Sequence, residues 1–241
     1  MSSRSAEAAL EEQSTPARIR DAAIRHIAAH GVADTTARGV ARDADVSPGL
    51  VIHHFGSMDR LRVVCDQHVV AVIRRSKTRA MSAGSLDPLA AARDTSIDLP
   101  VLAYLARTLT DGSPHVAELV AEMAEDAVGY LKAGQETGVI GQVEDLRGAA
   151  TVLTIWSLGA IVLHEHVNAL LGVDLLSTDL MTSPKALRNY QLPALDLMSG
   201  DLIPAHVRAQ IRTVLGAESP NEQPRDSDPS SEETLSKEAE Q

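Results

Sequence analysis

Apolar residues recur at three- and four-residue intervals along most of residues 16 to 216, which is the spacing of helices that bury one face. No stretch shows the alternation of a β-strand and no internal repeat is present, so we expect an all-α fold. The first helix should begin at Pro16 and end at Gly31, because Pro suits a first helical turn and Gly a helix end. Its buried face is predicted to carry Ile19, Ala23 and Ile27.

A second, shorter helix is expected after Thr35 and Thr36, whose hydroxyl groups can cap its first turn. The residues at core spacing in this helix are Ala37, Val40, Ala41 and Ala44. Arg38 and Arg42 fall one turn apart on the opposite face, where their guanidinium groups are free to meet phosphate.

A turn at Asp45 leads into a third helix, in which Ser47 is the expected N-cap and Pro48 the first helical residue. This third helix should end near His54. Two short helices joined by a tight turn form the geometry that places the second of them in the major groove of DNA. The sequence therefore predicts a helix-turn-helix over residues 35 to 54.

A longer fourth helix is predicted from Ser57 to about Arg79, and a domain boundary follows it at Gly84, Asp87 and Pro88. Further helices are expected at about 87–95, 100–111, 114–136, 144–171, 184–198 and 203–216. The polar ends of the chain, 1–13 and 217–241, carry no periodicity and are expected to be disordered. This leaves a head at 14–80 and a larger helical domain at 81–216.

The net charge of −11 alone argues against DNA binding, because phosphates repel an acidic protein. The distribution of the charge reverses that argument. Residues 14–79 hold eleven Lys and Arg against six Asp and Glu, whereas residues 80–241 hold ten against twenty-four. The basic charge is gathered where the helix-turn-helix is predicted.

Other features argue against secretion, a membrane span, a metal site and catalysis. Cys65 is the only cysteine, which excludes an intrachain disulfide and a thiolate zinc cluster and fits a reducing cytoplasm. Residues 1–13 lack the apolar core of a signal peptide, and the longest apolar run, 149–163, is too short to cross a bilayer. The His and Glu side chains of 164–166 point to different sides of a helix, and no catalytic motif occurs. We therefore expect no enzyme activity, no metal and no cofactor.

The run TTARGVARDADVSPG from Thr35 to Gly49, followed by His53-His54-Phe55, closely resembles the DNA-binding signature of the tetracycline-repressor (TetR) family. The resemblance covers residues 16–65, where the helix lengths, the cap residues and the pattern of core residues all match in the same alignment. It implies a three-helix DNA-binding head with a linking fourth helix, and a C-terminal domain that dimerises and binds a small molecule. The expected partners are double-stranded operator DNA, a small-molecule effector and a second copy of the chain. Most members of this family are repressors.

Position by position, the resemblance places Thr36 and Arg38 at the DNA-facing start of the second helix, and the helical pattern adds Arg42. The expected contacts on the recognition helix are Ser47, Pro48, Gly49, Leu50, Ile52, His53 and His54. Two departures stand out, since the family usually has Gly where Asp45 stands and Lys where Met58 stands. The second departure removes one expected phosphate contact.

The recognition helix is poor in side chains that hydrogen-bond base edges. Leu50 and Ile52 can touch thymine methyl groups but cannot read guanine. Base discrimination is therefore expected from Arg38, from His53 or His54, and from DNA shape.

The helix expected at 144–171 is apolar on more than one side and must be covered. Its symmetry mate and the last helix, 203–216, are expected to complete a four-helix dimer interface. The candidate ligand-binding residues, each of which can equally be ordinary core, are Tyr104, Met123, Tyr130, Trp156 and His164. The aliphatic lining around them favours a hydrophobic effector that is uncharged or cationic.

An alternative is a helical ligand-binding or adaptor protein whose DNA-binding head is weakened. Met58, the apolar recognition helix and the excess of acidic residues favour this alternative. A salt-sensitive mobility shift with DNA separates the two functions.

Overall fold

The computed structural model describes residues 14–83, 100–177, 180, 183–199 and 205–214, and every regular element within these ranges is a helix. The expected all-α fold is confirmed. In chain order the elements are α2 (Thr15–His30), α3 (Ala37–Asp43), α4 (Pro48–Phe55), α5 (Met58–Ser82), α7 (Val101–Leu109), α8 (His115–Glu136), α9 (Leu146–Val162), α10 (His164–Leu171), α11 (Pro184–Ala186), the π-helical turn η1 (Leu187–Gln191), α12 (Leu192–Ser199) and α13 (Ala205–Val214).

The chain forms two compact units, Met1–Leu192 and Pro193–Gln241. The helix predicted at 87–95, the boundary residues 84–88 and the two terminal segments lie outside the described residues. The division into a head at 14–80 and a larger domain at 81–216 stays a prediction.

The first helices begin and end where local chemistry predicts. Gly31 and Gly56 follow α2 and α4 with φ angles of 86° and 79°, a region of backbone conformation that side-chain-bearing residues rarely adopt. The hydroxyl oxygen of Ser57 accepts a 3.1 Å hydrogen bond from the backbone N–H of Arg60 and so caps α5. Gly31 and Gly56 thus end α2 and α4, and the cap at Ser57 begins α5.

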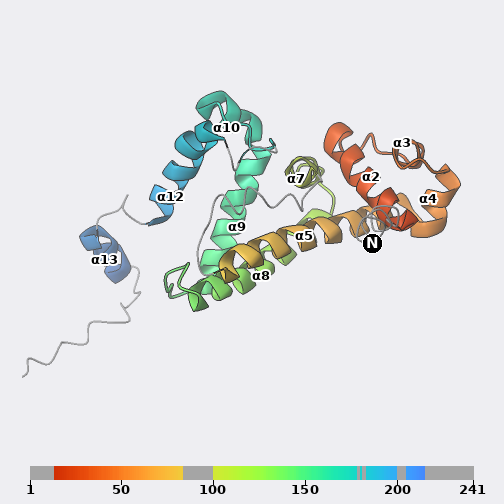
Figure 1. Cartoon of the computed structure of the whole chain (residues 1–241). Helices are drawn as coiled ribbons and strands as arrows, with labels where there is room; N and C mark the ends of the chain where they lie inside the picture. Colours follow the sequence, from red (N-terminus) through yellow and green to blue (C-terminus); the bar gives the residue numbers. More distant parts are fainter. Residues whose placement is uncertain (1–13, 84–99, 178–179, 181–182, 200–204, 215–241) are drawn as a thin grey trace, which may run out of the picture. The chain divides into compact units, whose positions relative to one another are not determined.

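One hydrophobic core extends from the head helices into α7. Fully buried members of this core are Ile19, Ile24, Val40, Val51, Leu61, Val69, Tyr104 and Leu105. Helix α7 packs against α2, while α5 lies alongside α8 and α8 alongside α9 (Figure 1). The head is therefore held to the rest of its unit by side-chain packing as well as by the covalent connection through α5.

Two predicted helices are interrupted. The segment 144–171 is not one helix but two, α9 and α10, which meet at an angle of 76°. The break lies at Leu163, whose φ of −91° and ψ of 17° are not helical, and because neither Pro nor Gly stands there the sequence pattern could not reveal it. The segment 184–198 contains η1 shortly before Pro193. A π turn suits this position because Pro donates no backbone hydrogen bond and its ring crowds the preceding turn.

None of the described helices is by itself long and apolar enough to cross a membrane. Helices α9 and α10 reach the required length and apolar content only as a pair, and that pair is sharply bent.

Candidate nucleic-acid interface

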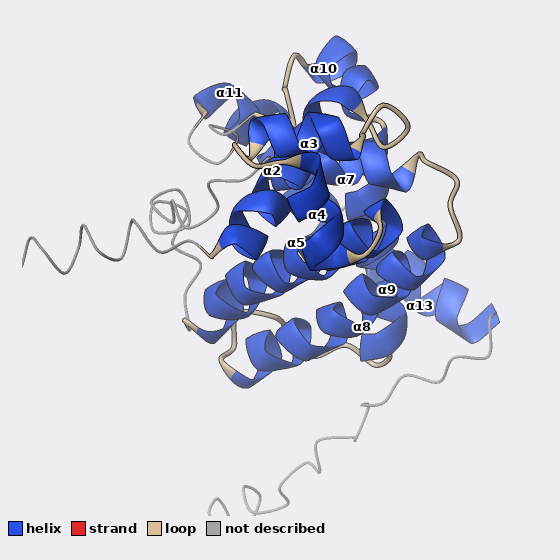
Figure 2. Cartoon of the chain, turned by 90° about the vertical axis from the view of Figure 1, so that its right-hand side faces the viewer, coloured by secondary structure: helices blue, strands red, loops and turns tan. Residues whose placement is uncertain are grey.

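Helices α3 and α4 lie on an outer face of their unit, and no described helix covers them (Figure 2). Their inward side chains are buried in the core, since Val40, Ala41 and Val51 are each at most 1% exposed. Arg38 and Arg42 are exposed on α3, as the helical spacing predicts. This outer face, formed by the solvent-exposed sides of α3 and α4, is the candidate interface with nucleic acid.

Two predicted contact residues also cap the helices of this face. The hydroxyl oxygen of Thr36 accepts a 3.2 Å hydrogen bond from the backbone N–H of Gly39, and that of Ser47 accepts one of 3.2 Å from Leu50. A hydroxyl group that accepts through its oxygen still has its own proton to donate. Thr36 and Ser47 can therefore fix the helix starts and donate to a phosphate oxygen at the same time.

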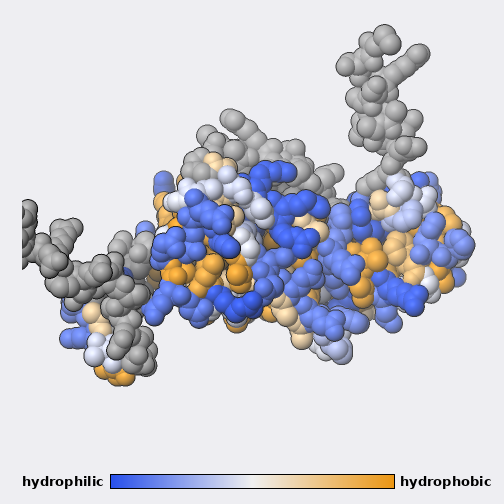
Figure 3. Space-filling model, turned by 90° about the horizontal axis from the view of Figure 1, so that it is seen from below, coloured by the Kyte–Doolittle hydropathy of each residue, from blue (hydrophilic) through white to orange (hydrophobic). Residues whose placement is uncertain are grey.

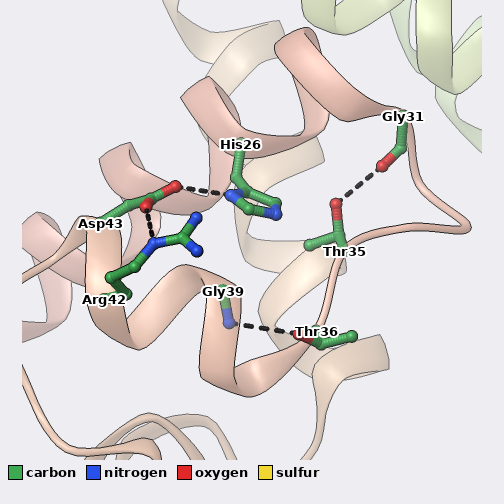
Figure 4. Close-up of polar contacts among 7 residues, drawn as sticks. All are labelled: His26, Gly31, Thr35, Thr36, Gly39, Arg42 and Asp43. Carbon is green, nitrogen blue, oxygen red and sulfur yellow. Dashed lines mark hydrogen bonds and ion pairs between the residues drawn. The ribbon is translucent and has the colours of Figure 1, made fainter.

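The junction between α2 and α3 is built on His26, which is only 6% exposed (Figure 4). Its ring nitrogen Nδ1 donates a 2.5 Å hydrogen bond to the carboxylate of Asp43, and the other oxygen of that carboxylate accepts a 3.1 Å bond from Arg42 Nε. The bond from His26 is the main reason why the pKa of Asp43 lies below its ordinary value. Burial opposes this shift, and the bond from Arg42 reinforces it.

Gly39 provides the space in which the His26 ring sits. A β-carbon at Gly39 would lie 2.8 Å from His26 Cε1 and 2.9 Å from its Nε2, closer than atoms of that kind approach one another. The chain from His26 through Asp43 to Arg42 was not predicted from the sequence. His26 lies 17 positions before Asp43, and the only local signal for their pairing was an otherwise unexplained Gly inside a helix.

The turn between α3 and α4 explains one departure from the TetR signature. Asp45 has a φ of 53°, the only positive φ among the described residues other than glycine. This left-handed conformation favours Gly, and Asp is one of the few other residues that tolerate it. The guanidinium of Arg18 donates a 2.8 Å hydrogen bond to the carbonyl of the preceding Ala44, which ties this turn to α2.

The recognition helix α4 presents a mixed apolar and imidazole surface. Leu50 is partly buried, and the exposed residues are Pro48, Gly49, Ile52, His53 and His54. The two His rings lie 5.5 Å apart in an edge-to-face arrangement. Met58, at the other departure from the signature, is partly buried against the core and adds no charge to this face. The roles of these residues in DNA binding stay predictions.

The five candidate ligand-binding residues do not come together in one site. Tyr104 is fully buried and Trp156 is 62% exposed. Met123 packs against the core shared with the head, Tyr130 packs against a separate cluster around Leu131, and His164 begins α10. Their roles in ligand binding stay predictions, and the structure separates Trp156 from the buried candidates.

Two polar contacts link α5 to α7 and the turn that follows it. The hydroxyl of Tyr104 donates a 2.6 Å hydrogen bond to the carboxylate of Asp66, in a buried position. Arg62 and Asp111 form an ion pair of 2.6 Å, with only 11% and 18% of their side chains exposed. The pKa of Asp66 is raised mainly by burial. The pKa of Tyr104 is also raised, first by burial and second by the negative charge of Asp66. Tyr104 therefore keeps its proton and remains the donor.

Residues 19–63 match the family described as bacterial regulatory proteins, tetR family, and residues 98–203 match the tetracyclin repressor-like C-terminal domain. Over 196 residues the chain is 36% identical to the HTH-type transcriptional regulatory protein RaaS of Mycobacterium tuberculosis, an alignment that covers 78% of this chain and 86% of that protein. It is 30% identical over 184 residues to the HTH-type transcriptional regulator BetI of Burkholderia cenocepacia and to that of Burkholderia ambifaria, covering 66% of this chain and 94% of each relative. The first matched segment contains the helix-turn-helix, and the second runs from before α7 into the segment after α12.

Proposed function

Because this chain belongs to the TetR family of helix-turn-helix transcriptional regulators, we propose that it is a sequence-specific repressor that leaves its operator when a small hydrophobic molecule binds. The observation that carries the proposal is the uncovered face of α3 and α4, on which Arg38 and Arg42 are exposed and Ser47 caps the start of the recognition helix. A helix held at its N-terminal end by Ser47 is rigid where its first residues would enter the major groove. The place of action follows from the partner, because operator DNA lies in the cytoplasm of a bacterium.

A second copy of the chain is the partner proposed for the exposed face of α9. Val152, Ile155 and Trp156 recur there at helical spacing and are 47%, 56% and 62% exposed. A contiguous apolar stripe of this kind is unusual on the surface of a monomer. In a two-fold dimer the same stripe meets itself, so one amphipathic helix supplies both halves of the contact.

In the proposed dimer, the small molecule weakens DNA binding through the spacing of the two recognition helices. Two recognition helices fit successive major grooves only when they lie about 34 to 36 Å apart or a multiple of that distance. In this proposal α5 links the ligand site to the DNA-binding head. The ligand favours a position of α5 in which the two recognition helices do not fit the operator. A coupling of about 1 to 3 kcal/mol between the two sites weakens DNA binding roughly 5- to 150-fold.

The site for the effector is proposed among the apolar side chains of α7 and α8. Tyr104 on α7 and Met123 on α8 lie in or against the core shared with the head, whereas Tyr130 packs against the separate cluster around Leu131. This lining supports a hydrophobic effector. Trp156 is better assigned to the dimer face because most of its side chain is exposed.

A mobility-shift titration with duplex DNA from upstream of the protein's own gene tests DNA binding. We expect a shift that weakens steeply with salt, because Lys and Arg release counterions from the phosphates they contact. Arg38→Ala should weaken binding and reduce the salt dependence while leaving thermal stability nearly unchanged, since Arg38 is exposed. Arg147→Ala, in an exposed ion pair on α9, is the matched control. Absence of binding to any genomic fragment would support the alternative, an adaptor or ligand-binding protein with a weakened head.

A further inference from the structure

The outward side of α4 is defined by which of its side chains face the core. Val51 is fully buried and Phe55, one turn later, packs partly buried against the core. Gly49 and His53 lie on the opposite side of the helix, also one turn apart. Ile52 flanks them and is 41% exposed, which makes it the most exposed large hydrophobic residue on α3 or α4. Hydrophobic surface is visible beside hydrophilic surface on the head, at the right of Figure 3.

Little on α4 can hydrogen-bond to a base. The sequence of the helix, PGLVIHHF, contains no Arg, Lys, Asn or Gln, the side chains that form paired hydrogen bonds with guanine or adenine. The oxygen of Ser47 already accepts the hydrogen bond that caps the helix. His53 and His54 lie in the last turn, whereas the first residues of a recognition helix approach the bases most closely. The outward residues of α4 that precede His53, from Pro48 to Ile52, therefore form an apolar reading surface.

Packing inside the protein does not explain why residue 49 is glycine. Gly49 is helical and has no positive φ, and a β-carbon there would meet only the hydroxyl oxygen of Ser47, at 4.0 Å. Glycine is among the least favourable residues within a helix. The contrast with Gly39 is direct, because at Gly39 the ring of His26 fills the space. The open space at Gly49 faces away from the protein, where the DNA would lie.

We propose that Ile52 reads the C5-methyl group of a thymine in the major groove, and that Gly49 lets the backbone of α4 approach the bases closely enough for this contact. The inference rests on the proposed DNA-binding function and adds the residue that determines specificity. Thymine is the only ordinary DNA base that presents a methyl group in the major groove. A branched aliphatic side chain at the edge of the outward face is the complement of that methyl group, because their contact removes apolar surface of both from water.

The test uses the full-length protein and a duplex selected from a random pool by binding to it. Each thymine is replaced in turn by uracil, which differs only by lacking the methyl group. We expect one pair of symmetry-related positions at which the change lowers affinity about fourfold per half-site and about fifteenfold when both are changed. Cytosine and 5-methylcytosine are also compared at the same position. A higher affinity for 5-methylcytosine shows that the methyl group alone is recognised, and equal affinities show that the whole thymine is required.

Ile52→Ala should bind the thymine duplex more weakly and should lose the difference between thymine and uracil. The control is Val64→Ala, which shortens an exposed aliphatic residue on α5 rather than on α4. This variant should keep the difference between thymine and uracil. Persistence of the thymine–uracil difference in Ile52→Ala, or its loss in Leu50→Ala instead, overturns the assignment to Ile52. A selected duplex with no uracil-sensitive position overturns the methyl readout while leaving DNA binding intact. Failure to select any duplex would overturn the proposed function and this inference together.

Gly49→Ala tests the second half of the proposal. We expect unchanged or higher thermal stability, because Ala is the better helix former and the space is open within the protein. Affinity for the selected duplex should nevertheless fall, and the uracil-sensitive positions should lose their effect as α4 is held away from the bases. Undiminished affinity with the same uracil sensitivity would overturn the role of Gly49.

Discussion

The hydroxyl of Tyr104 on α7 donates a 2.6 Å hydrogen bond to the buried carboxylate of Asp66 on α5. Because α7 also packs against α2, this bond lies where the head, α5 and the larger part of the unit meet. Tyr104→Phe keeps the ring but removes the donor, and should lower the free energy of unfolding by about 1.5–3 kcal/mol. Urea unfolding measures the loss.

Tyr130→Phe is the matched control for that substitution. Tyr130 is partly buried, and its hydroxyl forms no hydrogen bond with another described residue. Removal of this hydroxyl should change the free energy of unfolding by less than about 0.5 kcal/mol. Equal effects of the two substitutions would contradict a special role for the bond between Tyr104 and Asp66.

The raised pKa of Asp66 predicts a pH dependence of stability. Burial disfavours the charged carboxylate, so the folded protein holds the proton of Asp66 more tightly than the unfolded chain does. The contribution of this group is fully present below its ordinary pKa of 3.8 and is lost as the pH rises through the raised value. The free energy of unfolding of the wild type should therefore fall, relative to that of Asp66→Asn, as the pH rises above about 4.

Urea unfolding of the wild type and of Asp66→Asn at each pH gives the difference between their free energies of unfolding. The titration of other groups affects both proteins and largely cancels in this difference. Asp43, whose pKa is lowered, provides a comparison of opposite sign. Its contribution is present above the ordinary value of 3.8 and is lost as the pH falls through the lowered value. A flat difference between the wild type and Asp66→Asn would show that the folded and unfolded states bind this proton equally.

Two glycines should respond in opposite ways to alanine. Gly39→Ala places a methyl group against the buried ring of His26 and should destabilise the head by about 1–3 kcal/mol. Gly129→Ala, at an exposed position of α8 with nothing within 4 Å, should stabilise the protein by about 0.5–1 kcal/mol. Thermal unfolding of both variants checks the prediction. A neutral Gly39→Ala would mean that the His26 ring can move aside without losing its bond to Asp43.

The sequence predicted features that depend on neighbouring residues better than those that depend on distant ones. The caps at Thr36 and Ser47 were correctly expected, because a cap is decided within one helical turn. The hydrogen bond from the hydroxyl of Tyr104 to Asp66, 38 positions away, was not expected, because no local sequence pattern indicates such a pair. Apolar periodicity likewise could not show that the helix containing Trp156 ends before Leu163.

The left-handed turn at Asp45 gives a local prediction. Its φ of 53° costs a residue with a β-carbon about 1–2 kcal/mol, although Asp tolerates this conformation better than most residues do. Asp45→Ala should therefore lower the free energy of unfolding by about 1 kcal/mol, whereas Asp45→Gly should not lower it. Thermal unfolding compares the two variants. A loss of stability in Asp45→Gly would show that the carboxylate of Asp45, rather than its backbone conformation, stabilises the turn.

Trp156 is the only tryptophan of the chain, so its fluorescence reports directly on the exposed face of α9. If a second copy covers this face, the indole is shielded from water in the dimer and its emission should shift to longer wavelength as the protein is diluted through dissociation. Trp156→Glu should raise the dimer dissociation constant about a hundredfold or more, because an unpaired charge buried in an interface costs about 3 kcal/mol or more. Sedimentation equilibrium measures that constant. Val143→Glu, at an exposed apolar residue before α9, is the control and should leave it nearly unchanged. A dimer that survives Trp156→Glu, with emission independent of concentration, would place the contact between copies on another face.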